Sequence, residues 1–146
     1  QEELEKRTRR IVWCTVATVD SQGRPRSRIL HANWEGSTAW ILTGRDTLKT
    51  KHLARNPYIS LSYWDQQQEQ IYADCKAEWE DDPVEKERVW NFFKANDSPY
   101  GYDGSIIWPD GVHSEGVGIL RCTPWRIELA SMTIDPPTFH SMVWRA

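Results

Sequence analysis

The chain has 146 residues and a formal net charge of −3, with acidic and basic residues interleaved along it. This length predicts a single domain, residues 1–146, with its own hydrophobic core, and the interleaved charges argue against nucleic acid as a partner. No apolar run approaches the roughly 20 residues that a membrane-spanning helix needs, and no signal-peptide pattern is present, so we expect no membrane partner.

Two residue types give further expectations. The cysteines Cys14, Cys75 and Cys122 are odd in number and widely spaced, without a metal-binding or disulfide pattern. We therefore expect reduced, mostly buried thiols and a cytoplasmic location. Nine tryptophans are more than a core of this size can bury. Some of them should line a ligand cleft or a subunit interface.

The first third of the chain predicts a short charged helix followed by a β-hairpin. Residues 2 to about 10 are charged and suit a helix at the edge of the fold. Ile11–Val19 is rich in β-branched and aromatic residues and predicts a strand buried on both sides. Asp20–Gly23 is a hairpin turn, and Pro25–Trp34 returns as the second strand.

The second strand has an unusual face. Its period of two separates two sets of side chains: Arg26, Arg28, Leu30, Ala32 and Trp34 lie on one face, and Ser27, Ile29, His31 and Asn33 on the other. Two arginines on an otherwise apolar face are unfavourable unless an anion or a carboxylate meets them.

A third strand, Thr38–Thr43, leads into a short helix that should begin after Asp46 or Thr47 and end near Arg55. Cations and hydroxyls surround the start of this helix, and no acidic residue follows within the helix: the residues are Thr43, Arg45, Thr47, Lys49 and Lys51. Free N–H groups, hydroxyls and cations together predict a phosphate-binding site. The alternative is a solvated basic helix without a ligand.

The rest of the chain predicts mainly strands. Expected strands are Tyr58–Trp64, Gln70–Trp79, Val117–Cys122, Trp125–Ala130 and Phe139–Trp144. A helix begins at Pro83 after the N-cap Asp82, with Val89, Trp90 and Phe93 on its apolar face. The aromatic residues of the long loop Asn96–Gly116 favour an ordered cover. Six or more strands with short turns and inserted helices predict a small antiparallel barrel.

Motifs for protein-only catalysis are missing. The chain has no GxGxxG, Walker, HExxH or GxSxG motif. Its histidines, His31, His52, His113 and His140, lack metal-ligand spacing. If the protein is an enzyme, a cofactor therefore carries the chemistry.

An ordered set of segments resembles one known family. The segments are RPRSRIL (residues 24–30), WILTG (40–44), TLKTKHLARNPYISLSYWD (47–65), Gln70, TPWRIEL (123–129) and VWR (143–145). Together they resemble the pyridoxamine 5′-phosphate oxidase-like FMN-binding split barrels. The resemblance implies a mainly β (α+β) fold, a six- to seven-stranded antiparallel split β-barrel with short flanking helices. It also implies a homodimer that holds FMN at its interface and acts as an oxidoreductase on a small molecule.

The resemblance also implies which residues bind the cofactor. They are Arg26, Ser27, Arg28, Ile29, Leu42, Thr43, Thr47, Lys49, Gln70 and Trp125. An Arg-Lys pair that often clamps the phosphate in this family reads Leu48-Lys49 here, so Arg28, Arg45 or Lys51 is expected to compensate. Residues of the 123–129 segment or of the long loop are expected to come from the second subunit.

Departures from the family bear on the substrate. An Arg-x-His element near the C-terminus, which grips the substrate in true pyridoxamine phosphate oxidases, is absent, and only His140 stands in that region. We therefore do not predict vitamin synthesis, and we expect the loop 96–116 to define another substrate pocket. Candidate proton donors are Tyr100, Tyr102 and His113.

Two alternatives remain open. A deazaflavin on the same fold would place its long acidic tail along Arg45, Lys49, Lys51 and Arg55. The other alternative is a non-enzymatic module that binds flavin or haem, for which only the scattered histidines offer an axial ligand.

Overall fold

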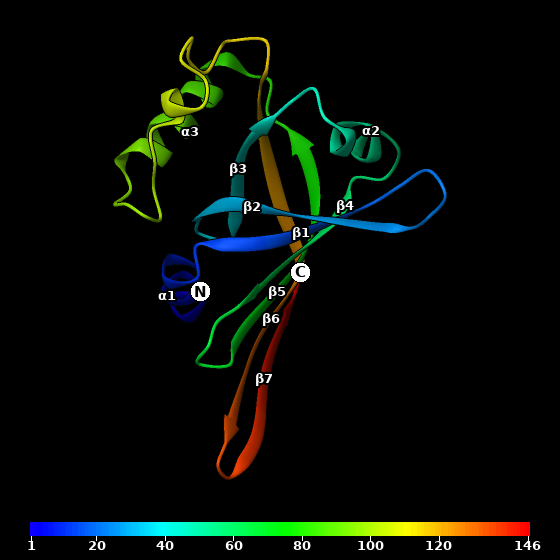
Figure 1. Ribbon diagram of the computed structural model, residues 1–146, viewed down its shortest axis with the longest axis vertical. Helices are drawn as coiled ribbons and strands as arrows, with labels where there is room; N and C mark the ends of the chain where they lie inside the picture. Colours follow the sequence, from blue (N-terminus) through cyan, green and yellow to red (C-terminus); the bar gives the residue numbers. More distant parts are fainter.

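The computed structural model describes residues 1–146 and has a seven-stranded antiparallel sheet as its centre (Figure 1). The strands are β1 (Trp13–Val19), β2 (Pro25–Glu35), β3 (Thr38–Gly44), β4 (Tyr58–Trp64), β5 (Glu69–Trp79), β6 (Val117–Ile134) and β7 (Pro137–Arg145). The helices are α1 (Glu2–Arg10), α2 (Leu48–Arg55) and α3 (Pro83–Ala95), and a 3-10 turn covers Gly104–Ile106. The strand order is β3-β2-β1-β4-β5-β6-β7, and β3 also pairs with β6, which closes the barrel. The predicted fold class is confirmed.

Side-chain alternation explains the strands that were predicted well. In β4, Ile59, Leu61 and Tyr63 are buried, whereas Tyr58 and Trp64 on the other face are exposed. The prediction for the first strand was wrong in one respect, because only one face of β1 is buried. Its other face looks away from the barrel interior, so polar residues are tolerated there.

The two strands expected on either side of Pro124 are one continuous strand, β6. The pairing with β5 shifts register there: Asp74 faces Arg126 and Cys75 faces Pro124, so Trp125 is an extra residue. Such a β-bulge accommodates a proline, which has no N–H for the ladder, without ending the strand. The expectation of two strands was therefore wrong.

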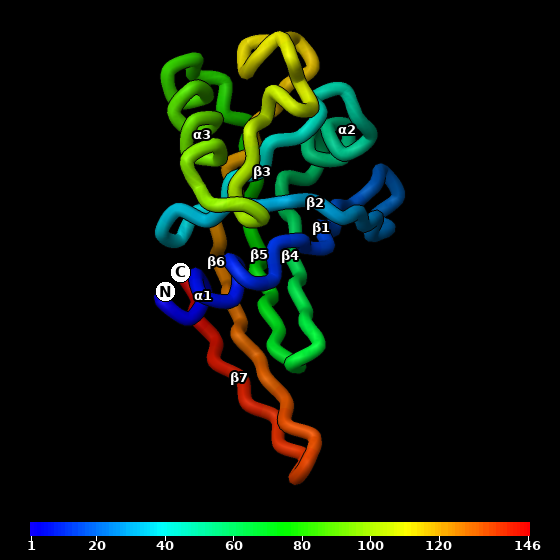
Figure 2. Tube along the Cα trace, turned by 60° about the vertical axis from the view of Figure 1, so that its left-hand side comes forward, coloured from blue at the N-terminus to red at the C-terminus, as the bar shows by residue number.

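Two hydrophobic clusters form the core. The larger one, with 19 residues, fills the barrel and includes Leu61, Ile71 and all three cysteines, which are free thiols. The smaller one, with 8 residues, lies where α3 packs against β3 and β6, and includes Trp90 and Phe93. Figures 1 and 2 show α3 at one end of the molecule and the projecting β6–β7 hairpin at the other. No helix of the structure is long and apolar enough to cross a membrane.

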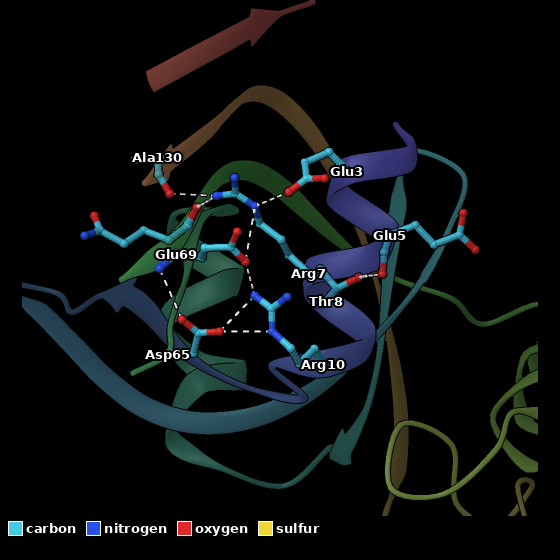
Figure 3. Close-up of polar contacts among 9 residues, drawn as sticks. Glu3, Glu5, Arg7, Thr8, Arg10, Asp65, Glu69 and Ala130 are labelled. Carbon is cyan, nitrogen blue, oxygen red and sulfur yellow. Dashed lines mark hydrogen bonds and ion pairs between the residues drawn. The ribbon is translucent and has the colours of Figure 1, made fainter. Parts of the chain in front are cut away.

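Arg7 fastens α1 to the barrel (Figure 3). Its buried guanidinium donates to the carbonyl oxygens of Gln70 at 3.1 Å and Ala130 at 2.6 Å, and to the Glu3 carboxylate at 2.8 Å. Beside it lies a second ion-pair group, formed by Arg10, Asp65 and Glu69. Because Arg7 donates to one carbonyl of β5 and one carbonyl of β6, it ties α1 to both strands.

The loop 96–116 is an ordered cover, as predicted, and Tyr100 anchors it to β2. The Tyr100 carbonyl accepts hydrogen bonds from His31 Nε2 at 2.5 Å and Asn33 Nδ2 at 2.8 Å. The backbone N–H of Trp34 donates to the Tyr100 hydroxyl oxygen at 2.5 Å. Tyr100 is 3% exposed. Its hydroxyl therefore holds the loop in place, which makes it a poor candidate for the predicted role of proton donor.

Candidate functional site

Arg28 lies at the centre of a group of polar side chains between β2 and α2. The pairing of β1 with β2 places Arg28 opposite Val16. Its guanidinium donates to the Val16 carbonyl at 3.2 Å and to Thr18 Oγ1 at 2.7 Å. The Arg28 side chain is half-buried. The two hydrogen bonds hold its guanidinium against β1.

Lys49 enters the same region from the first turn of α2. The helix begins after the N-cap Thr47, as predicted, and Lys49, His52 and Leu53 form its buried face. Lys49 Nζ donates to Thr47 Oγ1 at 2.9 Å and to the Gly44 carbonyl at 3.4 Å. The Lys49 side chain is thus folded back over the start of the helix.

Neither cation has a carboxylate partner. No ion pair of the molecule includes Arg28 or Lys49. Burial, and next the charge of Arg28, lower the pKa of Lys49. Burial and the charge of Arg26 lower the pKa of Arg28. Two partly desolvated cations that repel each other at a helix N-terminus favour a bound anion.

Beneath Arg28, the structure adds two residues that the sequence analysis did not include in the site. Thr18 Oγ1 lies 2.8 Å from His52 Nδ1 while it accepts the hydrogen bond from Arg28. Both residues are buried, at 1% and 4% exposure. Thr18 therefore orients the Arg28 guanidinium, and His52 holds the Thr18 hydroxyl. His52 could have been found from the sequence, because it follows Lys49 by three residues and therefore lies on the same face of the helix.

Arg45 lies apart from this cluster. It forms an ion pair with Asp81 at 2.7 Å, and its guanidinium lies 4.4 Å from the ring centre of Trp79. Of the three residues expected to compensate for the missing arginine, Arg45 is therefore already neutralised. Arg28 is the residue that lies beside Lys49 and carries an unpaired charge.

A basic groove lies between the β1–β2 hairpin and α2. It has a volume of about 570 Å³ and is lined by Asp20, Ser21, Arg24, Arg26, Leu48, Lys51, His52, Ala54 and Arg55. Asp20 is its one acidic residue, and it is already paired with Arg24 at 2.9 Å. The remaining cations make this groove a second attractive surface for negative charge.

The other face of β2 belongs to a broad sheet surface. Ser27 pairs with Ala17 and Ile29 with Thr15, so both side chains point away from the barrel interior. This outer face exposes large apolar side chains, with exposures between 37% and 61%: Trp13, Ile29, Tyr58, Trp64, Phe139 and Val143. A flat face with this many exposed aromatic residues is typical of an interaction surface.

The remaining predicted residues are spread over other strands. Thr43 is buried on β3 beside the start of α2, and the Leu42 side chain lies in the smaller hydrophobic cluster. Gln70 accepts a hydrogen bond from the Tyr72 hydroxyl at 2.7 Å. Its strand β5 lies three positions from β2 in the sheet, about 14 Å at ~4.8 Å per strand. Trp125, at the bulge of β6, is 47% exposed.

The structure therefore brings part of the predicted site together. Arg28, Lys49 and Thr47 form one cluster, and Arg26 lines the groove beside it. Ser27 and Ile29 border the cluster on the outer face. Gln70 and Trp125 stand apart from it within one chain. His113, a predicted proton donor, lies at the surface 3.9 Å from Glu87 of α3.

Comparison with known proteins gives a family and a fold. A family model described as pyridoxamine 5′-phosphate oxidase matches residues 1–124. No curated protein matches the sequence of this chain.

Three solved structures illustrate the similarity in fold. A protein related to general stress protein 26, of the pyridoxinephosphate oxidase family, from Clostridium acetobutylicum has a TM-score of 0.74 at 17% identity, covering 99% of this chain and 96% of its own. PhzG from Burkholderia lata, in complex with tetrahydrophenazine-1-carboxylic acid, has a TM-score of 0.72 at 12% identity, with 99% and 82% covered. A pyridoxamine 5′-phosphate oxidase-related, FMN-binding protein from Nostoc punctiforme has a TM-score of 0.63 at 14% identity, with 99% and 94% covered.

Proposed function

The chain belongs to the pyridoxamine 5′-phosphate oxidase family, and from this premise we propose that it is an FMN-dependent oxidoreductase that acts on a small molecule as a cytoplasmic homodimer. The family resemblance of the sequence and an FMN-binding protein of the same fold support a flavin as the cofactor. The finer parts of the proposal depend on the site described above.

The observation that carries the proposal is the pair of unpaired cations. Arg28 and Lys49 have no carboxylate partner, and Lys49 lies in the first turn of a helix without acidic residues there. The phosphate of FMN carries about two negative charges near neutral pH and offers several acceptor oxygens. It would neutralise both cations and accept from free N–H groups of the helix start. The donor set therefore fits the phosphate end of FMN.

The other residues have roles that follow from their positions. The Thr47 hydroxyl holds the Lys49 ammonium at 2.9 Å, and Thr18 holds the Arg28 guanidinium at 2.7 Å, so both cations are oriented before a ligand arrives. Ser27 and Ile29 lie on the outer face of β2, where they would contact the ring. A bound flavin would supply the hydride-transfer chemistry that the side chains lack. Positive charge nearby favours the reduced, anionic form of such a ring.

The proposed dimer uses the outer face of the sheet. Trp13, Ile29 and Trp64 are each more than half exposed there, a situation that a second copy would relieve by burial. Gln70 and Trp125 stand far from the Arg28 cluster of their own chain. A partner copy packed on this face would bring such residues to the cofactor from the second subunit. Two equivalent sites at a two-fold interface follow from that arrangement.

A deazaflavin is the second candidate, and the basic groove is the observation that favours it. Lys51 and Arg55 are exposed, belong to no ion pair and line the groove that continues from the phosphate cluster. A cofactor with a long acidic tail would place its carboxylates there. FMN ends at a single phosphate and leaves this groove unused.

The test is a parallel titration with FMN, riboflavin and the deazaflavin. Because riboflavin lacks the phosphate, FMN should bind at least tenfold more tightly, as measured by quenching of flavin fluorescence. Equal affinity for FMN and riboflavin would refute phosphate binding by this cluster. Reduction of bound FMN by NADH or NADPH, followed by turnover with quinone acceptors, would separate an oxidoreductase from a pure binding module. Sedimentation at micromolar concentration tests the dimer.

A further inference from the structure

We infer that the basic groove between the β1–β2 hairpin and α2 binds a nucleoside diphosphate, with His52 as a buried hydrogen-bond donor to a phosphate oxygen. The hairpin and α2 lie on the same side of the barrel (Figure 1), and the groove between them has a volume of about 570 Å³. FMN, the first candidate cofactor, leaves this groove unused. The inference therefore goes beyond the proposed function, and it does not depend on a bound flavin.

One face of α2 forms the first wall of the groove. Leu48, Lys51, His52 and Arg55 line it, at positions i, i+3, i+4 and i+7, which share one face of a helix. Lys51 and Arg55 are exposed, and neither belongs to an ion pair. This wall therefore presents two free positive charges on either side of an imidazole.

The β1–β2 hairpin forms the opposite wall and adds a third free cation. Arg26 is exposed there and belongs to no ion pair. The carboxylate of Asp20, the one acidic residue of the groove, accepts hydrogen bonds from the backbone N–H and from Nε of Arg24. Asp20 and Arg24 therefore neutralise each other. The charges of Arg26, Lys51 and Arg55 remain for a ligand.

His52 distinguishes the groove from an ordinary basic surface. It lines the groove, although it is only 4% exposed. Its Nδ1 lies 2.8 Å from Thr18 Oγ1, and its Nε2 has no partner in the protein. No side-chain nitrogen or oxygen of the molecule is both buried and without a partner, so Nε2 opens into the groove. The groove thus contains a buried polar group that only a ligand or water can satisfy.

The hydrogen bonds of Thr18 determine which ring nitrogen of His52 carries the proton. The Thr18 hydroxyl oxygen accepts from the Arg28 guanidinium at 2.7 Å. Two acceptors lie within reach of its own hydrogen, His52 Nδ1 at 2.8 Å and the Arg26 carbonyl at 3.5 Å, and the shorter contact is the stronger one. Because Nδ1 then accepts, the neutral ring carries its hydrogen at Nε2 and donates into the groove. A phosphate oxygen accepts such a hydrogen bond.

The size and lining of the groove select a nucleoside diphosphate among anions. Its 570 Å³ lies within the ~300–1,000 Å³ of pockets that enclose a whole small molecule, which is more than a single phosphate fills. Three free cations match a diphosphate, which carries about three negative charges near neutral pH. Leu48 is 51% exposed and offers apolar surface to the base. The diphosphate can belong to a free nucleotide or to FAD, which extends FMN beyond its phosphate.

The first test is a calorimetric titration with ADP and with adenosine at constant ionic strength. ADP should bind at least tenfold more tightly than adenosine. The double variant Lys51→Met/Arg55→Met should raise the Kd for ADP about tenfold, as expected for the loss of two exposed ion pairs. Both residues are exposed, so the variant should fold as the wild type does. The matched control is Lys6→Met, which removes an exposed cation of α1 and should leave the Kd for ADP unchanged.

The second test observes His52 directly in the wild type. Nitrogen-15 NMR should show a proton on Nε2 and none on Nδ1, and the Nε2 resonance should move when ADP is added. The resonances of His113, which lies at the surface beside Glu87, are the internal control and should stay in place. A proton on Nδ1, equal affinity for ADP and adenosine, or unchanged ADP affinity in a folded double variant would each overturn the inference.

A comparison of FAD with FMN identifies the source of the diphosphate. Tighter binding of FAD than of FMN, lost in the double variant, would support the groove as the site for the dinucleotide. Unchanged ADP affinity in the FMN-loaded protein would support it as a site for a free nucleotide. Binding of ADP without any binding of FMN would support the groove and refute the proposed function alone. Binding of FMN with neither ADP binding nor a preference for FAD would refute the groove alone.

Discussion

Replacing Lys49 by methionine removes one charge from the phosphate-binding cluster and keeps the length of the side chain. Lys49 is 8% exposed, and its ammonium has no carboxylate partner that could compensate for the loss of a ligand. A hydrogen bond to a charged group contributes about 1.5–3 kcal/mol. The variant should therefore bind FMN about 10- to 150-fold more weakly.

The same substitution should have little effect on the stability of the cofactor-free protein. The bonds to Thr47 and Gly44 are lost, at about 0.5–1.5 kcal/mol each. Against this loss, the variant no longer buries a cation that Arg28 repels. We expect the free energy of unfolding in urea to change by less than about 1.5 kcal/mol.

The assay is a fluorescence titration with FMN and with riboflavin, and the matched control is Lys51→Met. Lys51 lies exposed on the same helix, so its removal should change the Kd for FMN by less than about threefold. Riboflavin affinity should be the same in both variants. The reasoning is refuted if Lys49→Met binds FMN as tightly as the wild type, or if it loses riboflavin to the same extent as FMN.

Three further predictions concern stability. Arg7→Met should lower the free energy of unfolding by about 2–4 kcal/mol, because two carbonyls lose their buried donor. The control Lys6→Met, at an exposed position of α1, should change it by less than about 0.5 kcal/mol, and equal urea midpoints for the two variants would contradict this. Asp82→Ala should cost about 1 kcal/mol through loss of the α3 N-cap, measured by thermal unfolding with Asp110→Ala, which removes an exposed carboxylate, as the control. The pKa of Lys49 is lowered from 10.5 in the folded protein, so between the two values the unfolded chain binds more protons. Cofactor-free wild type should therefore gain stability relative to Lys49→Met as the pH rises toward about 10, and an unchanged difference would show that Lys49 is not desolvated.

Local signals in the sequence were sufficient for most of the secondary structure. The alternation of Tyr58–Trp64 gave β4 with its observed bounds. The Asp82-Pro83 pair gave the start of α3, where the carboxylate accepts from the N–H groups of Val84 and Glu85. β6 was divided wrongly, because a proline normally ends a strand, and a bulge depends on the partner strand rather than on the sequence of β6 itself.

The candidate site could be predicted only in part, because its supporting contacts join distant segments. Lys49 was found from the charge pattern at a helix start. Its neighbour His52, and the bond from His52 to Thr18 across 34 positions, depend on how α2 packs on β1. The ion pair between Arg45 and Asp81 also joins distant segments. It neutralises Arg45, which the sequence analysis had included among the cations of the phosphate site. The hydrogen bond between His31 and Tyr100 spans 69 positions and could be seen only in the folded chain.

A crystal structure of the protein with FMN would test the central claim most directly. The account predicts that phosphate oxygens lie about 2.7–2.9 Å from Lys49 Nζ and from the Arg28 guanidinium, the distance of charge-assisted hydrogen bonds, with the ring along Ser27 and Ile29 of β2. A phosphate bound elsewhere, with Lys49 still folded onto Thr47 and no anion near Arg28, would contradict it.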